Sequence, residues 1–138
     1  MTLNRTRNLV RDLMQIGVTT CSPETTIANL SKLFLEKDLE AVNVQNPEDG
    51  HALGMVTQSD LVNAYSMNST RELTVSEIMQ ENNDQILPDI PVITASQMML
   101  DNKVRSYFIM HHSGGIMYPA AYLSYKNIFT ISCRTGRK

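Results

Sequence analysis

The hydrophobic pattern of the chain changes its period several times and predicts alternating strands and helices. Residues 18–21 form a short apolar run that predicts a strand. Ser22, Pro23 and Glu24 follow it and predict the start of a helix, with a capping residue, a proline and an acid in the first turn. The next apolar residues recur at helical spacing and predict one buried helix face: Ile27, Leu30, Leu33 and Phe34.

Two more strands and a second helix are predicted after this helix. Residues 41–44 and 52–56 are strongly apolar, and the turn-rich sequence Asn-Pro-Glu-Asp-Gly at 46–50 lies between them. Residues 57–65 predict a helix that begins directly after the last strand. The expected order of elements is therefore β-α-β-β-α.

The same pattern occurs a second time along the chain. The sequence Val-Arg-Asp-Leu-Met at 10–14 lies 65 residues before Val-Ser-Glu-Ile-Met at 75–79, and Pro23 lies 65 residues before Pro88. Near the end of the second copy the offset becomes 67, and the two additional residues are expected in a glycine-rich loop at 111–115. The second copy predicts a strand at Ile86, a helix at 92–100, strands at 107–110 and 116–123, and a short helix from Tyr125.

The repeat predicts an α/β fold with two β-α-β-β-α units. We place repeat 1 at residues 8–66, a linker at 67–74, repeat 2 at 75–131 and a basic tail at 132–138. Because a unit of about 55 residues has too small a core by itself, we expect the repeats to pack sheet to sheet with pseudo-twofold symmetry.

Composition excludes several classes of protein. The net charge of −2 gives no general attraction to nucleic acid or to an anionic membrane, and no apolar run approaches the length of a membrane span. Two cysteines, Cys21 and Cys133, are too few for a disulfide framework, and we expect reduced thiols in a cytoplasmic protein. His111 and His112 have no carboxylate or cysteine at ligand spacing, so no metal site is expected. No general acid, base and nucleophile converge in the pattern, so we expect no catalytic residues and no enzyme.

The end of the third strand carries the candidate chemistry. Thr57 and Asp60 have the spacing of a capping box, in which the hydroxyl and the acid stabilise the start of a helix. The same two side chains suit a nucleotide, because a carboxylate can accept both ribose hydroxyls and a hydroxyl beside free helix amides can hold a phosphate. Both interpretations remain open. Ser124 and Asn127 occupy the corresponding places in the second copy and keep the cap, but an amide lacks the charge assistance of a carboxylate.

Three motifs together resemble the CBS domain. They are V-x-D-L-M at the start, T-x-x-P-x-x-T-I before the long helix and G-h-h-T-x-x-D-L at the end, where h is apolar. Two copies over residues 8 to 130 resemble a tandem CBS pair, or Bateman module, here expected to be stand-alone. The second closing motif departs from this pattern, with Ala121 in place of glycine, Ser124 in place of threonine and Asn127 in place of aspartate.

The resemblance implies a regulatory module that binds an adenine-containing ligand between the repeats. Candidate ligands are AMP, ADP, ATP and S-adenosylmethionine, with no required cofactor, and the expected partners are a second copy of the chain and an unidentified regulated protein. In such pairs the leading segment of one repeat holds the base for the site of the other repeat. This maps Met79, Gln80 and Glu81 onto the Asp60 site, and it maps Met14, Gln15, Ile16 and Gly17 onto the Asn127 site.

Charged neighbours are expected to make the two sites unequal. Arg105 and Lys126 lie near the Asn127 site and favour phosphate, whereas Glu40 corresponds to Arg105 and repels phosphate at the Asp60 site. Ala121 is expected to place a β-carbon where a glycine lets the backbone approach a ligand. A neutral or weakly charged adenosyl ligand would thus suit the Asp60 site. The alternative function is a structural dimerisation or protein-docking module whose degenerate sites stay empty.

Overall fold

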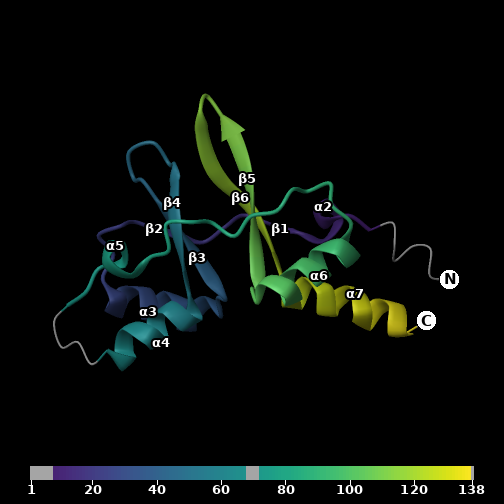
Figure 1. The fold of residues 1–138 in the computed structure, drawn as a ribbon, viewed down its shortest axis with the longest axis horizontal. Coiled ribbons are helices and arrows are strands. Elements are labelled where there is room, and N and C mark those ends of the chain that lie inside the picture. The colour runs from purple at the N-terminus through teal and green to yellow at the C-terminus, as the bar shows by residue number, and fades with distance from the viewer. Residues whose placement is uncertain (1–7, 68–71, 138) are drawn as a thin grey trace. The chain divides into compact units, whose positions relative to one another are not determined.

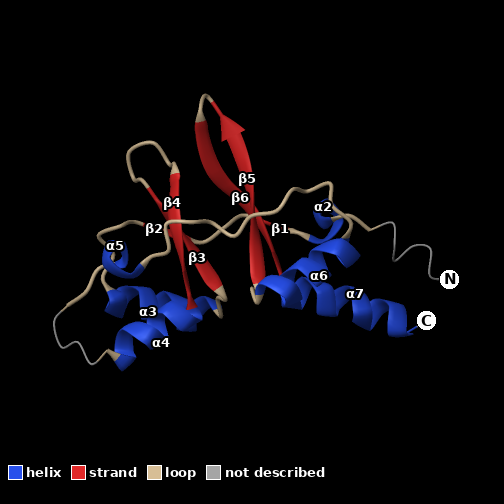
Figure 2. Cartoon of the chain, viewed as in Figure 1, coloured by secondary structure: helices blue, strands red, loops and turns tan. Residues whose placement is uncertain are grey.

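The computed structural model describes residues 8–67 and 72–137, and these form two compact units. Within the described ranges, unit 1 consists of residues 8–17, Asp84–His111 and 119–137, and unit 2 consists of residues 18–67, 72–83 and His112–Tyr118. Each unit has a three-stranded sheet with helices packed beside it (Figures 1 and 2). None of the helices in the described ranges combines the length and apolarity needed to cross a lipid bilayer.

Unit 2 has the predicted β-α-β-β-α order. Strand β2 pairs in parallel with β3, which pairs antiparallel with β4. Its elements are β2 (Thr20–Cys21), α3 (Ile27–Lys37), β3 (Ala41–Gln45), β4 (Ala52–Thr57), α4 (Gln58–Ser66) and α5 (Val75–Ile78). The buried core joins Leu30 and Phe34 of α3 to Val42, Val44 and Val56 of the sheet. The apolar periodicities predicted for these elements are therefore confirmed.

The predicted start of the first helix is wrong. Helix α3 begins at Ile27, and its capping residue is Thr26, whose side chain accepts a hydrogen bond from the Asn29 amide at 3.2 Å. Residues 22–25 form a turn instead of a helix. The carbonyls of Pro23 and Thr25 there accept hydrogen bonds from Ser76 and Val75, at 2.9 and 2.8 Å. Because these carbonyls bind another segment, they are not used in a first helical turn.

Unit 1 repeats the arrangement around the sheet order β1-β6-β5. Its elements are α2 (Val10–Leu13), β1 (Gln15–Ile16), α6 (Val92–Asn102), β5 (Ser106–Ser113), β6 (Ile116–Ser124) and α7 (Tyr125–Arg137). The far end of the β5–β6 hairpin, His112–Tyr118, is grouped with unit 2. The long helix starts after Pro91, as predicted, and buries Val92, Ala95 and Met99. The predicted strand at Ile86 is reduced to one bridge between Gln85 and Phe108.

Two predictions for the end of the chain are wrong. The expected loop at 111–115 is the tip of a hairpin, because β5 continues to Ser113 and only Gly114 and Gly115 form the turn. Both glycines have positive φ, 58° and 79°, which a two-residue hairpin turn favours. Helix α7 is also longer than predicted and runs to Arg137, through most of the expected tail. Tyr125 and Ile128 pack its first turns against the core of unit 1.

The two leading segments are held by matching hydrogen bonds, which confirms the offset of 65. The Val10 amide donates to the Ile90 carbonyl at 2.8 Å, and the Val75 amide donates to the Thr25 carbonyl at 2.8 Å. Each leading segment thus packs on the segment before the long helix of its own unit. As a result, residues 10–17 belong to the unit that contains the second long helix, and the compact units divide the chain differently from the sequence repeats.

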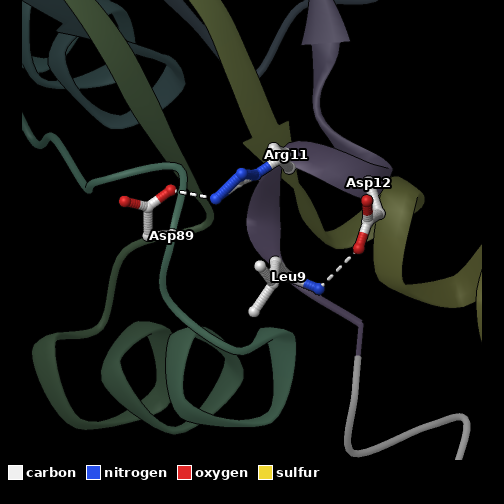
Figure 3. A network of polar contacts seen from close by, with 4 residues as sticks. All are labelled: Leu9, Arg11, Asp12 and Asp89. Atoms are coloured by element: carbon white, nitrogen blue, oxygen red, sulfur yellow. Dashed lines mark hydrogen bonds and ion pairs between the residues drawn. The ribbon is translucent and has the colours of Figure 1, made fainter.

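Each leading segment contains a short helix that the sequence did not predict, α2 in unit 1 and α5 in unit 2. In α2, the Asp12 carboxylate accepts a hydrogen bond from the Leu9 amide at 2.9 Å, and Arg11 forms an ion pair with Asp89 (Figure 3). In α5, the Glu77 carboxylate accepts from the Thr74 amide at 3.0 Å. The acid of each V-x-[DE]-h-M motif therefore caps a single helical turn.

Candidate functional site

The junction of β4 and α4 forms the first candidate site. Thr57 ends the strand and caps the helix. Oδ2 of Asp60 accepts hydrogen bonds from the Thr57 amide at 2.8 Å and from its hydroxyl at 3.0 Å, while the Asp60 amide donates to the Thr57 hydroxyl at 3.3 Å. The predicted capping box is confirmed.

Gln80 completes the arrangement around Asp60. Its side-chain amide donates to Oδ2 of Asp60 at 2.9 Å. The bonds from Thr57 and Gln80 all end on Oδ2, so the cap does not require the other oxygen, Oδ1. A carboxylate fixed through one oxygen can present the other as a strong acceptor without reorganising.

The backbone of Gln80 is fixed by β4. Met55 and Gln80 exchange two backbone hydrogen bonds, of 2.9 and 2.8 Å, in an antiparallel bridge. Gly54 makes this approach possible, because a β-carbon there would lie 2.2 Å from the Gln80 carbonyl oxygen. The glycine of the closing motif therefore has a role within the chain itself, which differs from the expected approach of backbone to a ligand.

The three residues that were predicted to contact a ligand at the Asp60 site, Met79, Gln80 and Glu81, have different surroundings in the structure. Met79 is half-buried and packs against the core of unit 2, whereas Gln80 and Glu81 are exposed. Met79 thus serves the core, and only the Gln80 side chain is hydrogen-bonded to Asp60.

A cavity of about 440 Å³ opens beside Asp60 within unit 2. Residues of α4, of α5 and of the segment before α5 line it: Asp60, Asn63, Ala64, Met67, Leu73, Glu77 and Ile78. The sequence analysis did not single out Asn63 or Glu77. A usable signal was present, since Asn63, Ala64 and Met67 follow Asp60 by three, four and seven residues and so share its helix face.

The junction of β6 and α7 forms the second candidate site, in unit 1. Oδ1 of Asn127 accepts hydrogen bonds from the Ser124 amide at 2.7 Å and from its hydroxyl at 3.0 Å. The cap is therefore retained without a charge, as predicted. Because Oδ1 of Asn127 accepts the hydrogen bonds of the cap, the side chain can offer a ligand only its amide nitrogen as a hydrogen-bond donor.

Residues 14–17 occupy the place in unit 1 that 79–82 occupy in unit 2. Gln15 and Ile16 pair with Tyr122 and Ala121, and the Gly17 amide donates to the Ala120 carbonyl at 2.9 Å. Ala121 fits in this regular strand pair and is buried. Met14 packs against the core, whereas the side chains of Gln15 and Ile16 are exposed. Between Gln15 and Asn127, both in the described part of the chain, no bond corresponds to that of Gln80 with Asp60.

The predicted cations lie at the start of α7. The Tyr125 amide donates to the Arg105 carbonyl at 3.2 Å, just as the Gln58 amide donates to the Glu40 carbonyl at 3.3 Å in unit 2. The equivalence of Arg105 and Glu40 is thereby confirmed. The Arg105 guanidinium lies over the Tyr125 ring, 5.5 Å from its centroid, and Lys126 is exposed on the next residue.

The two units differ in charge. In the described ranges, unit 2 contains ten acidic and two basic residues, whereas unit 1 contains four acidic and six basic residues. The acceptor Asp60 is thus in the strongly acidic unit, and the donor Asn127 is in the unit with a slight basic excess. The net charge of the whole chain conceals this difference.

The other reactive groups have ordinary surroundings. Cys21 lies on β2 beside the core, and burial raises the pKa of its thiol to about 11. His111 and His112 are exposed on β5, and the described residues include no cluster of three or more histidine, cysteine or acidic side chains suited to a metal.

Comparison with known proteins agrees with this geometry. Residues 10–67 match the family model of the CBS domain. The CBS domain pair of protein MJ0100, crystallised with 5′-methylthioadenosine and S-adenosyl-L-methionine, superposes with a TM-score of 0.79 over 95% of this chain and 98% of that one, at 19% identity. Residues 10–67 are thus similar to the CBS domain, and the chain has the fold of a CBS domain pair. Its α/β class and its tandem architecture are the predicted ones.

Further CBS proteins are similar. CBSX2, in a complex with AMP, has a TM-score of 0.73 over 93% of this chain and 98% of that chain, at 17% identity. The CBS domain-containing protein CBSX3, mitochondrial, of Arabidopsis thaliana is 28% identical over 101 residues, which are 70% of this chain. The chain spans about half the length of this curated relative, 49%.

Proposed function

We propose that this CBS pair is a regulatory, non-catalytic module that binds an adenosyl ligand and responds by changing its shape or its partner contacts. The observation that carries the proposal is the Asp60 carboxylate. It is held through Oδ2 by three hydrogen bonds, and it borders a cavity of about 440 Å³. A carboxylate fixed in this way is suited to accept the two hydroxyls of a ribose.

The ligands of similar proteins support an adenosyl compound. The MJ0100 pair was crystallised with 5′-methylthioadenosine and S-adenosyl-L-methionine, and CBSX2 was crystallised with AMP. These ligands share an adenosine and differ in the charge of the group attached to it. The shared adenosine has a ribose that an acceptor such as Asp60 can bind. The attached group differs in charge, so the charged residues around each site would decide which of these ligands binds there.

The charge of each unit favours a different adenosyl ligand. At the Asp60 site, Glu77 lines the cavity and unit 2 is acidic, which favours a neutral or cationic ligand such as S-adenosylmethionine. At the Asn127 site, the amide nitrogen, Arg105 and Lys126 are donors, which favours AMP, ADP or ATP. We propose that the Asp60 site is the stronger adenosyl site, since it alone offers a carboxylate to the ribose.

A ligand changes the conformation only if it binds one state more tightly than another. The module is proposed to act as a homodimer on a regulated protein, and to need no further cofactor. The exposed apolar side chains of the helices support a protein-protein contact.

Calorimetry and thermal unfolding with AMP, ADP, ATP and S-adenosylmethionine test the ligand. A site present at about 100 times its dissociation constant adds about 2.7 kcal/mol to the free energy of unfolding. The matched control is Asp60→Asn, because Asn127 shows that an asparagine at this position still caps the helix. If the folded protein binds none of these compounds, the sensor proposal is wrong and the structural docking module is favoured.

A further inference from the structure

Oδ2 of Asp60 accepts more hydrogen bonds than the capping box of α4 needs. The Thr57 amide and hydroxyl donate to this oxygen at 2.8 and 3.0 Å, and these bonds belong to the cap. The Gln80 side-chain amide adds a third bond at 2.9 Å. A carboxylate oxygen has about two lone-pair sites, so Oδ2 is filled. Oδ1, in contrast, accepts no hydrogen bond from any residue in the described ranges.

The bond from Gln80 is not needed to hold Asp60 in place. Unit 1 has the same cap, where the Ser124 amide and hydroxyl hold Oδ1 of Asn127 at 2.7 and 3.0 Å. Gln15 lies 65 residues before Gln80 and is its counterpart, but within the described part of the chain it makes no hydrogen bond to Asn127. This cap therefore forms without a glutamine, and the bond from Gln80 has a different consequence for Asp60.

The Gln80 amide occupies an acceptor that a ribose would use. Two vicinal hydroxyls bind a carboxylate most directly when each donates to a different oxygen. Oδ1 of Asp60 is open to the first hydroxyl, but the second would donate to Oδ2, which the Gln80 amide fills. The Gln80 side chain is exposed and regains rotamer freedom when it is released, while its backbone stays in the bridge with Met55. The amide can therefore leave Oδ2 without unfolding the segment.

We propose that Gln80 is a specificity-determining residue that competes with the ribose for Oδ2 of Asp60. The inference rests on the proposed function, because it concerns the same adenosyl site. A ligand with both the 2′ and the 3′ hydroxyl displaces the Gln80 amide, whereas a 2′-deoxy ligand uses Oδ1 alone and leaves Gln80 in place. Because this bond joins α4 to the segment after α5, only a ligand with an intact ribose releases the connection between them.

Titration calorimetry of the full chain with adenosine and 2′-deoxyadenosine tests this competition. Gln80→Ala and Gln80→Met both remove the amide donor and should bind adenosine several-fold more tightly, with no comparable gain for 2′-deoxyadenosine. The control is Gln97→Ala, since Gln97 is exposed on α6 of unit 1, and it should leave both affinities unchanged. Weaker or unchanged adenosine binding in the two Gln80 variants, or an equal gain for both nucleosides, would overturn the proposal.

Asp60→Asn tests whether the effect of Gln80 depends on the carboxylate. An asparagine keeps the cap, as Asn127 does, but it has no second carboxylate oxygen. Gln80→Ala should therefore give no gain in adenosine affinity in the Asp60→Asn background, which makes a double-mutant cycle. The same gain in both backgrounds contradicts competition for the carboxylate.

A measurement without ligand distinguishes this proposal from the proposed function. Proton exchange of the side-chain amides, followed by NMR, should be several-fold slower for Gln80 than for Gln15, and saturating adenosine should remove the difference. Equal exchange in the free chain contradicts the bond from Gln80 to Asp60 and leaves adenosyl binding intact. Slow exchange that persists with bound adenosine contradicts displacement. If Gln80 is protected but the folded chain binds neither nucleoside, the adenosyl site itself is wrong, and the competition is rejected with it.

Discussion

The carbonyl oxygen of Gln80 lies 2.2 Å from the point where residue 54 would carry a β-carbon. Gly54 is therefore required by the antiparallel bridge that brings Gln80 to β4, and this bridge places the Gln80 side chain on Asp60. In unit 1 the corresponding strand pair contains Ala121 opposite Ile16, and the β-carbon fits. The same pairing is thus tighter in the unit that has the carboxylate.

Gly54→Ala is expected to lower the free energy of unfolding by about 1–3 kcal/mol, because the new β-carbon meets backbone atoms that cannot rotate away. The matched variant is Ala121→Gly, which opens the equivalent pair and is expected to cost about 1 kcal/mol or less. Urea unfolding measures both. If Gly54→Ala is no more destabilising than Ala121→Gly, the bridge is not held by close approach.

The repeat and most elements could be predicted from the sequence because their signals are local. The spacing of apolar residues predicted α3, α6 and the paired strands, and the spacing of Thr57 and Asp60 predicted the capping box of α4. The short helices α2 and α5 were missed, since a single turn has too few residues to show a period. The late start of α3 depends on residues 73–76, about fifty positions away, which a local pattern does not contain.

The candidate site was predicted in part for the same reason. The resemblance to the CBS domain indicated residues 79–81 as ligand contacts. The hydrogen bond from the Gln80 side chain to Asp60 could not be predicted, because it depends on the backbone bridge between Gln80 and Met55. The contribution of Glu77 to the cavity depends on the packing of α5 beside α4. The difference in charge between the units could not be read along the sequence, because each unit gathers segments from distant parts of the chain.

Asp60 has two separable roles, and two substitutions distinguish them. Asp60→Ala removes the acceptor of the capping box and is expected to destabilise the fold by about 0.5–2 kcal/mol. Asp60→Asn keeps a capping oxygen, as Asn127 does, and is expected to cost less. Both variants should lose most of the thermal shift given by S-adenosylmethionine. A full shift with folded Asp60→Asn would show that the carboxylate does not contact the ligand.

The two sites are expected to differ in their preference for charge. Lys126→Glu should weaken AMP binding several-fold and leave adenosine binding unchanged, because only AMP has a phosphate to be repelled. Glu77→Gln should weaken S-adenosylmethionine more than adenosine, since it removes a negative charge from the cavity beside Asp60. Titration calorimetry with the three ligands tests this. Equal losses for all three ligands in either variant would indicate disturbed folding and not charge selection.

Cys21 and Cys133 are expected to react with thiol reagents at very different rates. Burial raises the pKa of Cys21 to about 11, so only about one molecule in a thousand carries the thiolate at pH 8. Cys133 is exposed. Labelling of native protein at pH 8 should modify one thiol rapidly, and unfolded protein should show two. Rapid labelling of native Cys133→Ser would contradict the burial of Cys21.

The same shift predicts how stability changes at alkaline pH. Cys21 keeps its proton in the folded chain up to about pH 11, whereas the unfolded chain loses it near the ordinary value of 9.0. Stability that is present below pH 9 should therefore fall between pH 9 and 11, since the folded state binds more protons there. Urea unfolding of the chain and of Cys21→Ala across this range isolates the contribution, because the variant should lack that part of the slope.

The ion pair between Arg11 and Asp89 is expected to contribute little to the attachment of the leading segment in unit 1. Both side chains are largely exposed to solvent, and such pairs typically contribute about 0.2–1 kcal/mol. The buried Val10 is different, because Val10→Ala removes fully buried apolar surface and should cost about 2 kcal/mol. A double-mutant cycle of Arg11→Ala and Asp89→Ala, measured by urea unfolding at low and high salt, gives the coupling energy. A coupling well above 1 kcal/mol that persists at high salt would show that the ion pair, and not the buried valine with its backbone hydrogen bonds, holds the segment in place.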